Sequence, residues 1–132
     1  MLATSHINSN PEYANLADLT NTLPFFAYLQ DCNPGHFDIP QTDCFCEELT
    51  DLDYGGFAAV CFARSGGNTG FHQEFWDAIY SKGIYQIGDA LADSREEFIS
   101  VINTYRYCYY QQTLFGDPAA QLKMNNSNTL AL

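Results

Sequence analysis

The stretch LPFFAYLQDCNPG, residues 23–35, joins a short apolar run to a cysteine and a tight turn. Pro24 opens the run and the Asn-Pro-Gly triplet at 33–35 closes it. A bounded apolar run of this length is typical of a buried strand in a parallel sheet. Cys32 then lies at the carboxyl end of that strand, the edge at which open α/β sheets bind ligands. A thiol held there is a candidate nucleophile, and the alternative is a buried structural cysteine.

The rest of the chain alternates between helical and extended patterns. Apolar residues predict helices over 43–52, 71–81 and 86–104, a strand over 57–63, and a third strand or a last helical turn over 107–115. The weak pattern of residues 1–18 predicts a loop with one helical turn near 14–19. The polar composition of residues 124–132 predicts a frayed tail. The order strand, helix, strand predicts an α/β protein whose first two strands are parallel and joined by a right-handed crossover.

Composition limits the classes of partner. The 132 residues fit one domain, and a hydrophobic content of 46% suits a packed core. A formal net charge of −11 argues against nucleic acid or an anionic membrane surface as a partner. No apolar run approaches the length of a membrane span, and the first residues lack the basic start and apolar core of a signal peptide.

The cysteines do not form a recognisable framework. Their number, five, is odd, and their spacing is unlike that of a disulfide-stapled miniprotein, so free thiols are expected. Cys32, His36, Cys44 and Cys46 offer thiolate and imidazole groups to a metal. The single residue between Cys44 and Cys46 differs from the C-x2-C pairs of zinc sites, however. The sequence therefore predicts no metal and no cofactor.

The segment CNPGHFD at 32–38 resembles the surroundings of the catalytic cysteine in gingipain-like peptidases, which are cysteine endopeptidases with a caspase-like fold. Five further pieces resemble segments of that family in the same order: LTN at 19–21, DCFCEE at 43–48, GGFAAV at 55–60, FHQEFWDAI at 71–79 and LFGDP at 114–118. The resemblance runs from about Leu19 to Lys123 and covers the C-terminal half of such a domain.

This resemblance implies a fold and a domain organisation. The expected fold is a three-layer α/β/α sandwich with a mainly parallel, caspase-like sheet that is truncated at its N-terminus. A partial peptidase domain is expected over 1–123, followed by the polar tail at 124–132, with a peptide or protein as substrate. Gingipain-like proteins are typically exported, whereas this chain shows no signal peptide, so the localisation stays open.

The resemblance also assigns the chemistry. Cys32 takes the place of the nucleophile, and its own N–H, with that of Asn33 nearby, lies where an oxyanion donor is needed. The family's base is a histidine upstream of the cysteine, in a His-Gly sequence whose glycine supplies a second donor. His6 is the only upstream histidine here, and Ile7 stands where the glycine is expected.

Further residues are expected around Cys32, on the substrate side or at the oxyanion site: Asn33, Gly35 and His36 in the turn, and Arg64 and Ser65 after the second strand. His72 is expected to be a surface residue at the start of a helix. Asp31 departs from the family pattern, because a carboxylate beside a thiol opposes thiolate formation. Alternation along the strand is expected to turn the Asp31 and Cys32 side chains apart.

Two functions remain open. The first is hydrolysis of peptide bonds through a thioester on Cys32, which Cys32 and its flanking residues favour. The second is a non-catalytic remnant or pseudoenzyme that acts as a binding module, which the His6-Ile7 pair favours. If earlier strands are absent, the strand at 24–31 is an edge, and this predicts self-association or a complementing N-terminal segment.

Overall fold

The structure is a computed structural model that describes residues 16–40, 42–65, 69–101 and 106–124. Its elements are, in order, the 3-10 helix η1 (Leu16–Asp18), β1 (Phe25–Tyr28), α1 (Phe45–Asp51), β2 (Gly56–Phe62), α2 (Thr69–Tyr80), α3 (Ile87–Val101), α4 (Arg106–Gln111) and β3 (Gln112–Gly116). The chain is a mixed α/β protein, as predicted. The predicted polar tail lies outside the described residues, except for Met124.

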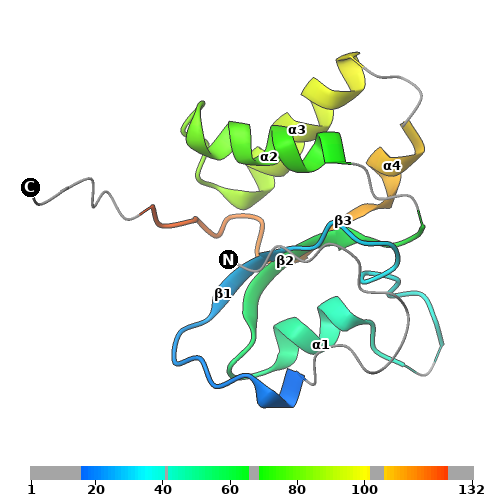
Figure 1. The fold of residues 1–132 in the computed structure, drawn as a ribbon, viewed down its shortest axis with the longest axis vertical. Coiled ribbons are helices and arrows are strands. Elements are labelled where there is room, and N and C mark those ends of the chain that lie inside the picture. Colours follow the sequence, from blue (N-terminus) through cyan, green and yellow to red (C-terminus); the bar gives the residue numbers. More distant parts are fainter. Residues whose placement is uncertain (1–15, 41, 66–68, 102–105, 125–132) are drawn as a thin grey trace, which may run out of the picture.

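The three strands form one sheet in the order β1-β2-β3 (Figure 1). β1 and β2 are parallel, with Ala27 opposite Ala59 and Tyr28 opposite Val60, which confirms the predicted parallel pair. β3 runs antiparallel to β2, with Phe115 opposite Ala59. The carboxyl ends of β1 and β2 and the amino end of β3 therefore meet at one edge of the sheet, which we call the cysteine edge.

Helices cover both faces of this sheet. Figure 1 shows α1 on one side and α2 with α3 on the other. Successive residues of β1 serve the two faces in turn: Ala27 packs with Cys46 and Leu49 of α1, whereas the ring of Phe26 stacks on Phe75 of α2 at 5.6 Å between centroids. Full burial of a large apolar side chain contributes roughly 1.5–3 kcal/mol, so the two layers hold β1 from both sides.

Some bounds differ from the predicted ones. β1 ends at Tyr28 rather than near residue 31, because the chain turns away after a last bond from the Leu29 N–H to the Val60 carbonyl at 2.8 Å. The segment predicted as either a strand or a helical turn contains both, since α4 ends at Gln111 and β3 begins at Gln112. The helical turn predicted near residues 14–19 is η1.

The start of α1 is tied to the cysteine edge. The N–H of Cys44 donates to Glu47 Oε2 at 2.7 Å, and this carboxylate also suits the positive end of the helix dipole. The N–H of Cys46 donates to the carbonyl of Pro34 at 3.0 Å. Pro34 belongs to the turn that follows Cys32, so helix α1 holds that turn in place through this hydrogen bond.

Candidate active site

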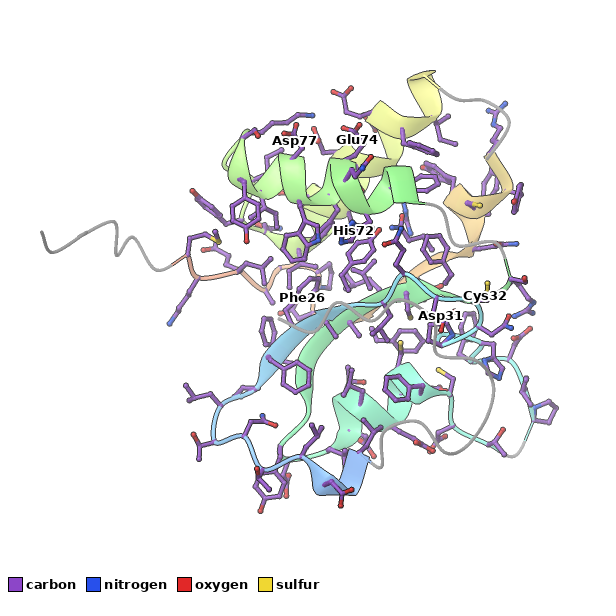
Figure 2. The ribbon with its side chains drawn as sticks, in the orientation of Figure 1. Phe26, Asp31, Cys32, His72, Glu74 and Asp77 are labelled. Atoms are coloured by element: carbon purple, nitrogen blue, oxygen red, sulfur yellow. The ribbon has the colours of Figure 1, made fainter. Side chains whose placement is uncertain are left out.

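Cys32 lies just beyond β1, exposed at the cysteine edge (Figure 2). The structure thus places it where the strand pattern predicted, and its exposure removes the alternative of a buried structural cysteine. The next residue, Asn33, has a φ of 71°, in the left-handed region that residues other than glycine seldom adopt. Backbone strain of this kind is found preferentially at functional sites.

Backbone hydrogen bonds fix the turn after Cys32 on two sides. The N–H of Gly35 donates to the carbonyl of Phe62, at the end of β2, at 3.1 Å. The hydrogen bond from the Cys46 N–H to the Pro34 carbonyl links the other side of the turn to helix α1. A side chain on a turn held in this way keeps a defined position, which nucleophilic catalysis requires.

Glycine is required at position 35 by close packing. A Cβ atom there would lie 2.5 Å from Cys61 Sγ and 3.2 Å from the ring of Phe115. Gly35 therefore seats the turn against the sheet. Its N–H already donates to Phe62, so the role that the structure gives Gly35 is support of the turn.

Residues from the end of β2 complete the cysteine edge. The hydroxyl of Ser65 lies 3.7 Å from Cys32 Sγ, within range of an O–H···S hydrogen bond. Arg64 forms a bidentate ion pair with Asp38, in which Nη1 donates to Oδ1 at 2.8 Å and Nη2 donates to Oδ2. The guanidinium holds the pKa of the Asp38 carboxyl below its usual range. Ser65 thus contacts the thiol, whereas Arg64 joins the edge to the segment after the turn.

A cleft of about 470 Å³ opens beside this ion pair. Its lining consists of Phe37, Asp38, Ala63 and Arg64 together with residues 110–114, where α4 passes into β3. Asp38 and residues 110–114 were not predicted from the sequence as part of this edge. Asp38 could have been found as an acid following the Cys32 turn, opposite a base that follows β2. Residues 110–114 reach the edge only because β3 is antiparallel.

Asp31 lies in an unexpected place. It is only 4% exposed, and its Oδ1 accepts a hydrogen bond from the N–H of Cys32 at 2.6 Å. Strand alternation was expected to carry this carboxylate away from Cys32, but β1 has already ended at Tyr28 and the carboxylate turns back onto the amide. The other oxygen, Oδ2, is buried and has no hydrogen-bond partner within the described residues.

The histidines occupy three different situations. His36 uses Nδ1 and its backbone N–H on the carbonyl of Asn33, so it closes the turn. His72 is half-buried between α2 and the sheet, edge-on to Tyr28 at 5.2 Å between centroids, and burial lowers the pKa of its imidazole. His72 thus lies in the first turn of α2, as expected, but it is half-buried rather than fully at the surface, and Figure 2 shows it apart from Cys32. His6 lies outside the described residues.

The other four cysteines are buried, unlike Cys32. Burial raises the pKa of the Cys44 thiol to about 11, and it also raises the pKa of Cys46. Burial is likewise the main cause that raises the pKa of Cys108, with a contribution from the nearby Cys32. Thiols held protonated in this way are poor nucleophiles. Cys61 is fully buried in β2, so Cys32 is the one exposed thiol among the five cysteines, all of which the structure describes.

A family model described as peptidase family C25 matches residues 3–123. The chain belongs to peptidase family C25. This is the gingipain family of cysteine peptidases, so the resemblance found in the sequence is confirmed, and the match extends it upstream from Leu19 to residue 3. Neither the curated proteins nor the solved structures provide a match to this C25 chain.

Two further findings concern this C25 chain. Across the described ranges, no three His, Cys, Asp or Glu side chains gather in a way that could hold a metal ion. None of the helices in the described part of the chain is long and apolar enough to cross a membrane.

Proposed function

We propose that this chain acts in a gingipain-like cysteine endopeptidase, with Cys32 as the nucleophile. The observation that carries the proposal is an exposed cysteine on a turn fixed to the sheet, with the Ser65 hydroxyl 3.7 Å from its sulfur, in a chain of family C25. The proposal includes a caspase-like, three-layer arrangement, supported by helices on both faces of the sheet. It also includes a partial peptidase domain over residues 1–123 and a tail after it.

The proposed reaction proceeds through a thioester. A base removes the proton of the Cys32 thiol, and the sulfur attacks the carbonyl carbon of the scissile peptide bond. The carbonyl oxygen becomes an oxyanion, and the N–H groups of Cys32 and Asn33 are the backbone donors closest in sequence to the sulfur. The tetrahedral intermediate collapses, the amine leaves with the proton from the base, and water then hydrolyses the thioester to regenerate the thiol.

The neighbouring residues take supporting roles in this proposal. Ser65 orients the thiol, and Gly35 and His36 hold the turn in shape. The cleft beside Arg64 and Asp38 receives a part of the peptide chain next to the scissile bond. No cofactor enters the proposed reaction.

The base is a histidine from upstream of Cys32. His6 is one candidate, and a histidine on a complementing N-terminal segment is the other. Ile7 follows His6, so the glycine donor that the family places after its histidine is missing at this position. Loss of one oxyanion donor typically lowers the rate by about 10²–10³-fold.

Release of a fluorophore from a mixed peptide library tests the proposed function. We expect the 132-residue chain alone to cleave very weakly. Adding an upstream segment that carries His-Gly after an apolar strand should restore cleavage, and Cys32→Ala should abolish the restored activity. Fast cleavage by the chain alone, lost in both Cys32→Ala and His6→Ala, would contradict the need for a complementing segment and identify His6 as the base.

A second function, a non-catalytic binding module, is favoured by one observation. The N–H of Cys32 is engaged by Asp31 rather than open to a substrate. A module of this kind would retain peptide in the cleft with equal affinity in the wild type and in Cys32→Ala, and it would show no turnover even with the upstream segment present.

A further inference from the structure

The contact between Asp31 and Cys32 bears directly on the chemistry proposed for this edge. Asp31 Oδ1 lies 2.6 Å from the backbone nitrogen of Cys32, at the short end of the range for a charge-assisted hydrogen bond. The carboxylate is almost wholly buried, at 4% exposure, so water weakens this bond little. The amide of the candidate nucleophile is thus already bound to an anion of the protein itself.

An oxyanion hole needs the same amide. Stabilisation of the tetrahedral intermediate depends on N–H groups that point at the developing negative charge and have no stronger acceptor. An N–H directed at a carboxylate is not available to a second anion. The carboxylate charge would also repel an oxyanion formed beside it.

The second oxygen of Asp31 makes no hydrogen bond to a described residue that would stabilise the fold. Oδ2 is buried without a hydrogen-bond partner in the described part of the chain. A buried polar atom left in this state destabilises the folded protein. Burial of Oδ2 therefore carries a cost in stability, while the engaged oxygen, Oδ1, is directed at the amide of the reactive residue.

We propose that Asp31 is a built-in competitor for the oxyanion hole of Cys32. The proposal rests on the function proposed above, because it concerns the donor which that reaction uses. In the structure the competitor is engaged, and the Cys32 amide becomes available to an oxyanion only when the Asp31 carboxylate moves off it. Asp31 is a positioning residue in this role, since it acts through the amide of Cys32.

Two thiol reactions separate this role from a general effect of charge. A peptide aldehyde adds to Cys32: a bond forms between the sulfur and the aldehyde carbon, and the thiol proton ends on the former carbonyl oxygen. That oxygen occupies the oxyanion site. Iodoacetamide also forms a bond to the sulfur, but iodide leaves, the thiol proton passes to water, and no oxyanion forms. Charge near the thiol affects both reactions, whereas an occupied oxyanion hole affects the aldehyde alone.

The test compares Asp31→Asn and Asp31→Ala in the 132-residue chain. Both variants lose the charge, but asparagine keeps an acceptor for the Cys32 N–H and alanine does not. We expect iodoacetamide to alkylate Cys32 at similar rates in the two variants. Aldehyde binding should be tighter in Asp31→Ala than in Asp31→Asn, by up to about 10²-fold, the effect of one oxyanion donor. Asp53→Asn, an exposed position between α1 and β2, is the control for net charge.

Each contrary result has a distinct meaning. Equal aldehyde affinity in Asp31→Ala and Asp31→Asn, with Cys32 still bound by the aldehyde, would overturn the competition while leaving the nucleophile in place. No aldehyde adduct in any variant after the upstream His-Gly segment is added, with Cys32 still alkylated by iodoacetamide, would overturn the proposed function itself. Asp31→Val, similar in size to the natural residue, replaces Asp31→Ala if circular dichroism shows that the alanine variant is unfolded.

Discussion

At the scale of single residues, burial separates one thiol from the other four. Cys32 is exposed, whereas Cys61 lies inside β2 with no exposed surface. We therefore expect mild alkylation with iodoacetamide, followed by peptide mapping, to modify Cys32 well before Cys61. The same experiment in denaturant is the control, since all five thiols should then react alike. Equal protection of the two cysteines in the folded chain would remove Cys32 from any open site.

His72 gives a second prediction at this scale. Burial lowers the pKa of its imidazole, so the unfolded chain binds more protons than the folded chain once the pH falls below about 6.5. The free energy of unfolding should therefore decrease on acidification through this window, and the loss is complete below the lowered pKa. In urea titrations at about pH 7.5 and about pH 5.5, acidification should destabilise the wild type more than His72→Phe, which keeps an aromatic ring against Tyr28. Equal losses in both proteins would contradict this.

Individual site residues were predictable where strand direction alone determined their place. Cys32 and Ser65 follow two parallel strands, so the sequence could assign both residues to one edge of the sheet. In the structure, Ser65 Oγ lies 3.7 Å from Cys32 Sγ. The contact of Asp31 with the Cys32 amide could not be predicted in this way. It depends on how the chain turns after β1 has ended, where strand alternation gives no information.

At the scale of elements, the join between the Cys32 turn and the sheet depends on Gly35. A Cβ at this position would lie 2.5 Å from Cys61 Sγ, well inside contact distance. We expect Gly35→Ala to lower the free energy of unfolding by about 1–3 kcal/mol, the usual effect of overpacking, as measured by urea denaturation. Cys61→Ala removes the colliding sulfur, so Gly35→Ala should cost less in that background. An equal cost in both backgrounds would place the strain elsewhere.

Whether a segment forms a helix or a strand was predictable where its apolar spacing extends over several turns, and uncertain where the segment is short. Helices α2 and α3 follow apolar spacing over several turns, and the structure has them close to the predicted ranges. The segment 107–115 is short and aromatic, and the sequence left a choice between a third strand and a last helical turn. Pairing with β2 resolves the choice at Gln112, where the ladder with Phe62 begins. That contact spans a long stretch of chain, so local sequence does not encode it.

At the scale of the whole molecule, β1 combines the burial of an interior strand with the position of an edge strand. Its residues Phe26, Ala27 and Tyr28 are at most 7% exposed, which is typical of strands covered on both faces. Within the described residues, however, β1 pairs with β2 alone. An apolar hollow of about 710 Å³ adjoins it, lined by residues that include Leu23, Phe57 and Trp76. An edge of this kind favours pairing with another strand.

We therefore predict that this chain self-associates, or that it needs a complementing N-terminal segment to remain soluble as a monomer. Association should strengthen as salt is added, because the net charge of −11 on each copy opposes it at low ionic strength. Leu23 is 77% exposed beside β1, so Leu23→Lys should weaken association by about tenfold, or about 1.4 kcal/mol, in light scattering across a dilution series. Ile39→Lys, which places the same charge at the opposite end of the sheet, is the matched control and should leave association unchanged. A monomer that persists at high concentration and high salt would contradict the prediction, since nothing would then be pairing with the open edge of β1.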